Sequence, residues 1–204
     1  MSQANSAATP RFLDALDYAV RLHGTDVKKG TSIPYAAHLL GVCALVLLDG
    51  GTEDEAVAAL LHDALEDHPA ETGREIIAKR FGDKVLAIVD MCTDTPMDYK
   101  GGPKPPWRQR KSAFLQRLAV EGQSGLRVAL ADKLDNARSI LADYRQAGES
   151  VWGRFNAGKQ DQLWFFRSLA EVFRSAGARG FLLDEFERTV SELERTAGAP
   201  VCGE

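Results

Sequence analysis

Apolar side chains recur at three- and four-residue spacing along most of the chain, which is the period of an amphipathic α-helix. No segment shows the alternation of apolar and polar residues over several turns that a half-buried strand shows. We therefore predict an all-α protein, a helical bundle with one core and no internal repeat. The helices are expected to begin near Pro10, Pro34, Thr52, Thr72, Asp83 and Trp107, followed by a strongly apolar helix over 126–141 and two amphipathic helices within 150–197.

Prolines, glycines and capping sequences predict where these helices begin and end. Pro10 and Pro34 suit the first turn of a helix, where a missing N–H costs nothing. The first helix should end near His23 and the second at Gly50-Gly51. Thr52 to Glu55 and Thr72 to Glu75 both match the capping-box pattern. The helix that begins after Thr52 is expected to continue through Leu61 into the sequence HDALED.

The chain divides by composition into a folded part and two loose ends. Residues 1–9 are small and polar and are predicted to be a disordered N-terminus. Residues 10–197 form the predicted domain, with its motifs in 19–138 and its C-terminal helices in 150–197. Residues 198–204 are predicted to be a loose tail.

One long loop, residues 94–106, is rich in proline and glycine. Such a length fits a lid or binding loop, and a solvated linker fits equally well. Basic and aromatic residues continue to position 111, which leaves both interpretations open for the whole 94–111 segment.

Composition narrows the class of protein. The chain has 204 residues, of which 45% are hydrophobic and 26% charged, as in an ordinary soluble domain. A net charge of −4 argues against nucleic-acid or membrane-surface binding. Three dispersed cysteines, including Cys43 and Cys92 as expected core residues, fit a reducing cytoplasm. The N-terminus lacks a secretory-signal pattern, and no apolar run is long enough to span a membrane.

The densest chemistry lies in Leu60-Leu61-His62-Asp63-Ala64-Leu65-Glu66-Asp67. On one continuous helix His62 would share a face with Glu66, and Asp63 with Asp67. Four ionisable groups in a packed helix are costly unless something neutralises them, and a bound cation is the simplest answer. The alternative is an exposed acidic helix end with one structural histidine.

Two further candidates lie on other helices, His38 and Asp132. Two imidazoles and two carboxylates suit a borderline divalent metal, and the coordination positions they leave open suit hydrolysis. Taken singly, His38 could be a core histidine and Asp132 a partner of Lys133. His23 could serve as a cation at a helix C-terminus. His68 has no evident partner and is expected at the surface.

The order of these residues resembles the HD-domain metal-dependent phosphohydrolase superfamily. It resembles most the hydrolase domain of RelA/SpoT enzymes and the stand-alone small alarmone hydrolases. The resemblance covers about 11–145 and rests on Ala19-x-x-x-His23, KKGTSIPYAAH ending at His38, LLHDALED, Thr93-Asp94 and ADKLDNAR at 131–138.

The resemblance implies a role for each matching residue. It implies that a divalent metal is bound, usually Mn²⁺, with Fe²⁺, Co²⁺, Ni²⁺ and Zn²⁺ as alternatives. Glu66 and Asp67 would orient or deprotonate the attacking water. The implied metal ligands are His38, His62, Asp63 and Asp132, and the implied substrate contacts are Lys28, Lys29, Lys133, Asn136 and Arg138.

The implied activity is hydrolysis of a phosphorylated nucleotide, with guanosine 3′,5′-bis(diphosphate), ppGpp, cleaved at the 3′ position as the leading substrate. Lys28 stands where the family commonly has arginine, and Leu39 follows His38 where proline is common, which leaves guanine selectivity open. The alternatives are hydrolysis of another nucleotide or phosphoester, and a non-catalytic nucleotide-binding module. We expect no nucleic-acid or membrane partner, and self-association remains open. We expect no synthetase domain after Glu204.

Overall fold

The computed structural model describes residues 9–94, 104–120 and 122–198 of the chain. Its regular structure over these ranges is helical, apart from an isolated bridge between Val27 and Pro34. This confirms the all-α prediction. The helices are α1 (Pro10–His23), α2 (Ala36–Leu48), α3 (Glu53–Leu61), α4 (Ala64–Asp67), α5 (Arg74–Phe81), α6 (Asp83–Cys92), α7 (Trp107–Leu118), α8 (Gln123–Ala147), the 3₁₀ helix η1 (Gly148–Arg154), α9 (Lys159–Ser175) and α10 (Phe181–Gly198).

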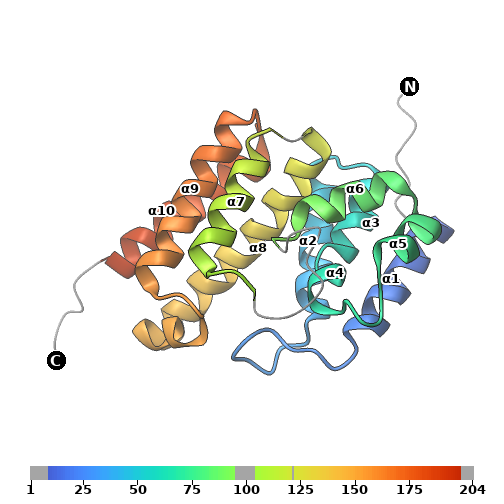
Figure 1. Ribbon diagram of the computed structural model, residues 1–204. Coiled ribbons are helices and arrows are strands. Elements are labelled where there is room, and N and C mark those ends of the chain that lie inside the picture. Colours follow the sequence, from blue (N-terminus) through green and yellow to red (C-terminus); the bar gives the residue numbers. More distant parts are fainter. Residues whose placement is uncertain (1–8, 95–103, 121, 199–204) are drawn as a thin grey trace.

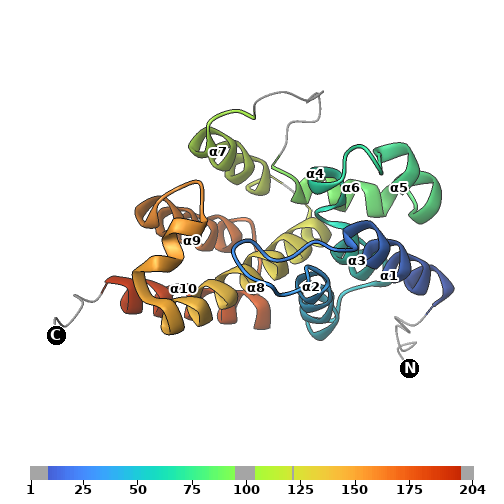
Figure 2. The same ribbon diagram turned by 90° about the horizontal axis from the view of Figure 1, so that it is seen from below.

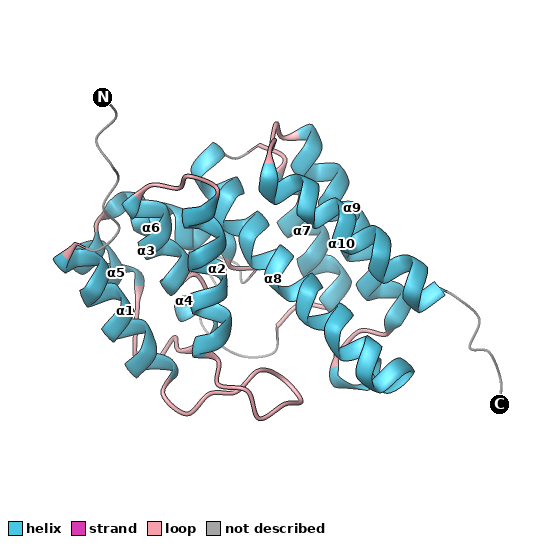
Figure 3. Cartoon of the chain, turned by 180° about the vertical axis from the view of Figure 1, so that it is seen from behind, coloured by secondary structure: helices cyan, strands magenta, loops and turns pink. Residues whose placement is uncertain are grey.

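The longest helix, α8, lies between two groups of helices (Figure 1). It packs against α2, α3 and α6 on one side and against α9 and α10 on the other. The views from below and behind show the same arrangement (Figures 2 and 3). Buried residues recur along α8 on more than one face, from Leu126 to Tyr144. Residues on α8 can therefore meet residues from both groups.

Helix α3 is the most deeply buried helix, with every residue from Glu55 to Leu61 at 0% exposure. Its predicted capping box is present at Thr52 and Glu55. The buried Glu55 carboxylate also accepts from Arg127 Nη1 of α8 at 2.6 Å, and Arg127 Nε donates to Asp49 at 2.9 Å. A buried charge needs such a partner. This ion pair holds α3, which leads directly into His62, against α8, which carries Asp132.

Three of the predicted helix boundaries were wrong. Helix α2 begins at Ala36, because Pro34 is instead paired in the bridge with Val27. Thr72 does not cap α5: its hydroxyl bonds to Tyr18 at 2.6 Å, and Gly73 is the N-cap. The helix after Thr52 does not run into HDALED but ends at Leu61.

The structure also tests the predictions made for the N-terminus, the cysteines and membrane-spanning segments. Thr9, assigned from sequence to the loose N-terminus, caps α1 by accepting from the N–H of Phe12 at 3.1 Å. Cys43 and Cys92 are buried, as predicted. The loop 94–106 lies largely outside the described residues. Within the described ranges, no helix is long and apolar enough to cross a membrane.

Candidate metal centre and adjoining pocket

The break between α3 and α4 determines how His62 and Asp63 point. After Leu61 the backbone makes a turn, and α4 begins when the N–H groups of Glu66 and Asp67 bond to the Asp63 carbonyl at 3.0 and 2.9 Å. Neighbouring side chains on an unbroken helix diverge by about 100°. At the break, His62 and Asp63 instead present Nε2 and Oδ2 only 2.9 Å apart.

Four side chains from three parts of the fold converge at this point. Nε2 of His38, on α2, lies 3.2 Å from Nε2 of His62 and 3.6 Å from Oδ2 of Asp63. Oδ1 of Asp132, on α8, lies 3.4 Å from Nε2 of His38 and 3.7 Å from Nε2 of His62. Ligands about 2.1 Å from one ion would lie roughly 3.0 to 3.4 Å apart. The spacing of His38, His62 and Asp132 therefore fits a divalent metal, and Asp63 lies beside both imidazoles.

The other nitrogen of each imidazole has an acceptor. Nδ1 of His62 lies 2.8 Å from the carbonyl oxygen of Ala59, and Nδ1 of His38 lies 2.7 Å from Oδ2 of Asp135. The acceptors are a carbonyl oxygen and a carboxylate oxygen, so each Nδ1 donates its hydrogen. Both Nε2 lone pairs are then directed into the cluster, as metal-binding histidines require.

The electrostatics of the cluster also favour a cation. Burial by itself would lower the pKa of His62, but Asp63 and Asp132 outweigh it and raise that pKa to about 10. For the same reason the pKa of His38 is raised well above its usual value. Two imidazoles whose Nε2 atoms are 3.2 Å apart have no room for a proton on each. One divalent ion would neutralise the carboxylates and satisfy both nitrogens.

The two acids that follow lie at the edge of the cluster. Glu66 accepts from Lys104 Nζ at 3.0 Å. Desolvation, with the like charges of Asp63 and Glu66, raises the pKa of Asp67 to about 7. Asp67 also lines an open depression with Tyr35, whose hydroxyl donates to Asp63. Asp67 is exposed to solvent, so it can exchange a proton with water while partial desolvation and its acidic neighbours keep its pKa raised.

A pocket opens next to His38. Lys28 and Lys29 reach it from the α1–α2 loop, residues 24–35, and Asn136 from α8. Figure 2 shows this loop alongside α8. Asn136 also donates to Asp132 at 2.5 Å, so it touches both the pocket and the cluster. Lys133 is mostly buried and bonds to Asp132 at 2.5 Å.

Two predicted contacts, Lys133 and Arg138, do not line this pocket, and several pocket residues were missed. Arg138 pairs with Glu185 of α10 at 2.8 Å and does not line the pocket. The residues that sequence reasoning missed include Asp135, which follows Asp132 by three positions and so shares its helix face. The missed residues that line the pocket are Thr31, Ile33, Tyr35, Ser139, Ile140, Asp143, Arg154 and Phe155.

Two further histidines depart from expectation. His23 is buried rather than a solvated cation, with Nδ1 3.1 Å from Oδ2 of Asp26. His68 has a partner after all, because its Nε2 lies 2.7 Å from the same oxygen. The nearby Asp26 was not singled out from sequence. These three residues form a second cluster of possible ligands.

Comparison with known proteins supports this picture. A model of the HD domain matches residues 15–163. The chain is 37% identical over 132 residues to guanosine-3′,5′-bis(diphosphate) 3′-pyrophosphohydrolase MESH1 of Xenopus tropicalis, covering 63% of this chain and 69% of that protein. It is 34% identical over 128 residues to a guanosine-3′,5′-bis(diphosphate) 3′-pyrophosphohydrolase of Aquifex aeolicus, covering 62% of this chain but only 17% of that longer protein.

Two solved structures share the fold. The Listeria monocytogenes protein lmo0812 superimposes with a TM-score of 0.66 at 28% identity, covering 79% of this chain and 96% of that one. A metazoan ortholog of SpoT, described as hydrolysing ppGpp, superimposes with a TM-score of 0.68 at 24% identity. That second match covers 93% of this chain and 97% of the ortholog.

Proposed function

Because the chain belongs to the HD-domain family, we propose that it is a metal-dependent phosphohydrolase that removes pyrophosphate from the 3′ position of ppGpp. The observation that carries the proposal is the convergence of His38, His62, Asp63 and Asp132 beside a pocket that holds two lysines. The names of the Xenopus and Aquifex relatives support ppGpp as the substrate.

We propose Mn²⁺ as the ion, held by those four side chains. Two imidazoles and two carboxylates form a donor set of intermediate softness, which Fe²⁺, Co²⁺, Ni²⁺ or Zn²⁺ would also accept. Four protein ligands leave positions open if the ion is octahedral. The ion supplies a Lewis acid that polarises the scissile phosphate and makes water more acidic.

The residues of the chain would handle the proton and the charge. Asp67 takes a proton from the attacking water, because its raised pKa lets it accept one near neutrality. Glu66 lies on the same short helix and orients that water. The new bond joins the water oxygen to phosphorus, and the bond from phosphorus to the 3′ oxygen breaks. The 3′ oxygen takes up a proton, returned from Asp67 or from solvent, to become the hydroxyl of GDP, and pyrophosphate is the other product.

The adjoining pocket would bind the rest of the nucleotide. Lys28 and Lys29 offset phosphate charge, and Asn136 offers an amide close to the cluster. Phe155 supplies an aromatic face on which a purine can stack. Arg154, in the same wall, carries the flat guanidinium that Lys28 lacks.

A second candidate is a phosphohydrolase that acts on another nucleotide through the same metal centre. Lys28 favours it, because this side chain is already engaged with Ser139 and lies 3.6 Å from Asp135. A guanine-stacking arginine is absent from that position.

We also propose a reducing cytoplasm as the compartment in which the enzyme works. The support is that Cys43 and Cys92 are both buried free thiols.

The test is pyrophosphate release by purified protein loaded with Mn²⁺, across a panel of ppGpp, GTP, GDP and ATP. We expect ppGpp to be the best substrate. Asp63→Ala should lose activity by several orders of magnitude, while Asp184→Asn, an exposed carboxylate on α10, should match the wild type. Turnover of other nucleotides but not ppGpp would refute the substrate alone. No turnover of any phosphoester would refute the enzyme.

A further inference from the structure

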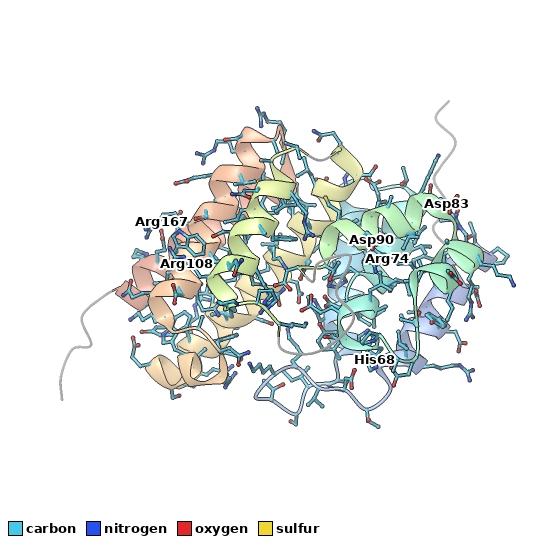
Figure 4. All side chains as sticks on the ribbon, viewed as in Figure 1. His68, Arg74, Asp83, Asp90, Arg108 and Arg167 are labelled. Atoms are coloured by element: carbon cyan, nitrogen blue, oxygen red, sulfur yellow. The ribbon has the colours of Figure 1, made fainter. Side chains whose placement is uncertain are left out.

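A second group of metal-ligand side chains lies outside the cluster described above. It consists of His23 at the end of α1, Asp26 in the α1–α2 loop and His68 after α4. Oδ2 of Asp26 lies 3.1 Å from His23 Nδ1 and 2.7 Å from His68 Nε2. Figure 4 shows His68 at the foot of α4, next to that loop. Two residues at or just after the end of α1 and one residue after α4 thus place one ligand atom each within 4.8 Å of the others.

Backbone hydrogen bonds hold the three residues in place. The N–H of Asp26 bonds to the His23 carbonyl at 2.6 Å, and the Asp26 carbonyl accepts from Tyr35 at 2.9 Å. The His68 carbonyl accepts from the N–H of Thr72 at 3.0 Å. The arrangement is therefore built into the chain path and does not depend on long, freely rotating side chains.

The protonation states suit metal binding. Burial, reinforced by His68, lowers the pKa of His23, so its imidazole is neutral at physiological pH. A hydrogen bond from His68 lowers the pKa of Asp26, so its carboxylate is ionised. Nε2 of His23 makes no hydrogen bond to the described residues. Its Nδ1 carries a proton only because the carboxylate of Asp26 can accept it in a hydrogen bond. An ion can replace that proton.

An ion could reach this cluster from solvent. The side chains of Asp26 and His68 are 39% and 17% exposed, whereas that of His23 is 2% exposed. Asp26 and His68 line the open depression that also contains Lys29 and Asp67. Two histidines and one carboxylate on one side of an ion would leave its remaining positions directed toward that depression.

The two clusters have one aromatic ring between them. Tyr35 stacks on His23 with ring centroids 4.9 Å apart, and its ring meets His38 edge-on at 5.4 Å. The Tyr35 hydroxyl donates to Asp63. The second cluster is therefore adjacent to the first without sharing a ligand with it.

We propose that His23, Asp26 and His68 bind a second divalent ion of the borderline class, which includes Zn²⁺ and Co²⁺. The ion ties the α1–α2 loop, which carries Lys28 and Lys29, to the segment after α4. Its binding depends on neither hydrolysis nor the identity of the substrate.

The test is the stoichiometry of Co²⁺ binding to the full chain after removal of metal with a chelator. Titration is followed by visible absorption and by metal analysis after gel filtration. We expect two equivalents for the wild type. Asp26→Asn and His68→Gln should each bind the second equivalent at least tenfold more weakly and leave the first unchanged. Glu71→Gln, close to His68 but outside the three ligands, should keep both.

First-site variants separate the two clusters. Asp132→Asn should weaken the binding of the Co²⁺ equivalent at the first cluster. It should leave unchanged the affinity for the equivalent whose binding depends on His68. Melting temperatures in chelator identify any variant that fails to fold, and Asp26→Asn, which preserves side-chain shape, then replaces His68→Gln. A wild type that binds one equivalent, or a second equivalent unaffected by both Asp26→Asn and His68→Gln, would overturn the proposal. Absence of hydrolysis with two equivalents bound would count only against the proposed function.

Discussion

The carboxylate of Asp135 accepts a hydrogen bond from Nδ1 of His38, with Oδ2 and Nδ1 2.7 Å apart. Gly41 makes this approach possible, because a Cβ at that position would lie 2.6 Å from Asp135 Oδ1. The same carboxylate lies 3.6 Å from Lys28 Nζ. Asp135 therefore connects a proposed metal ligand to the basic α1–α2 loop.

Replacing Asp135 should weaken metal binding without removing a proposed ligand. Asp135→Ala leaves His38 without an acceptor for Nδ1, so the ring loses its fixed tautomer and orientation. Loss of such a partner typically costs about 10- to 100-fold in metal affinity. Calorimetric titration with Mn²⁺ measures the change.

Two variants separate orientation from charge. Asp135→Asn keeps an oxygen that can accept from His38 and should have an intermediate affinity. Gly41→Ala leaves both partners intact but displaces the carboxylate, so it should resemble Asp135→Ala. Wild-type affinity in both Gly41→Ala and Asp135→Ala would contradict the positioning role.

The rate of hydrolysis should rise with pH through a limb that belongs to Asp67. A proton acceptor works only when ionised, and desolvation raises the pKa of Asp67 to about 7. Activity is therefore lost as pH falls below that value, and a bound cation nearby should move the limb to lower pH. Asp67→Asn should remove the limb along with most of the activity. If the pH-dependent limb persists in Asp67→Asn, the proton acceptor is another group. Glu66→Gln, which changes the neighbouring acid, is the matched comparison.

Phe155 should contribute to substrate binding and not to the chemical step. Its ring lines the pocket together with Lys28 and Lys29. Of the proposed metal ligands, only His38 also lines this pocket. Loss of one base-stacking face costs about 1–3 kcal/mol, so Phe155→Ala should raise KM roughly tenfold with kcat nearly unchanged. Steady-state kinetics on ppGpp provide the measurement. Phe181→Ala, at an exposed position on α10, should change neither constant.

Removing Arg127 should destabilise the fold, because Glu55 has 0% exposure and would lose its cationic partner. An uncompensated buried charge costs about 3–5 kcal/mol, so the free energy of unfolding of Arg127→Met should fall by roughly that amount. Urea denaturation followed by circular dichroism gives the value. Arg188→Met, which breaks an exposed pair with Glu185, should cost less than about 1 kcal/mol. Equal losses in both variants would contradict the stated role of burial.

Helical periodicity was sufficient to predict the helix class and most helix positions, because each long helix buries one face against its neighbours. It did not predict the break at His62-Asp63. Local sequence there is as helix-compatible as its surroundings, and the turn arises from tertiary packing around the cluster. The capping box at Thr72 failed for a similar reason, since its hydroxyl bonds to Tyr18 on a distant helix.

The residues proposed for the site divide in the same way. His38, His62, Asp63 and Asp132 stood out because their types and order match a motif. Asp135 and His68 did not stand out, because their partners come from distant segments. The partner of Asp135 is His38 on α2, and the partner of His68 is Asp26 in the α1–α2 loop. Arg154 and Phe155 lie beyond the resemblance, so only the folded chain brings them to the pocket.

The pocket wall contributed by Arg154 and Phe155 follows the last proposed ligand in sequence, whereas the metal cluster is complete by Asp132. Lys28 and Lys29 enter the pocket from before the proposed ligands, but this wall is encoded separately from them. Changes confined to the stretch after α8 could redirect the enzyme to a different nucleotide while the hydrolytic centre is inherited intact. For engineering, this makes residues 148–155 the place to graft or randomise a new specificity.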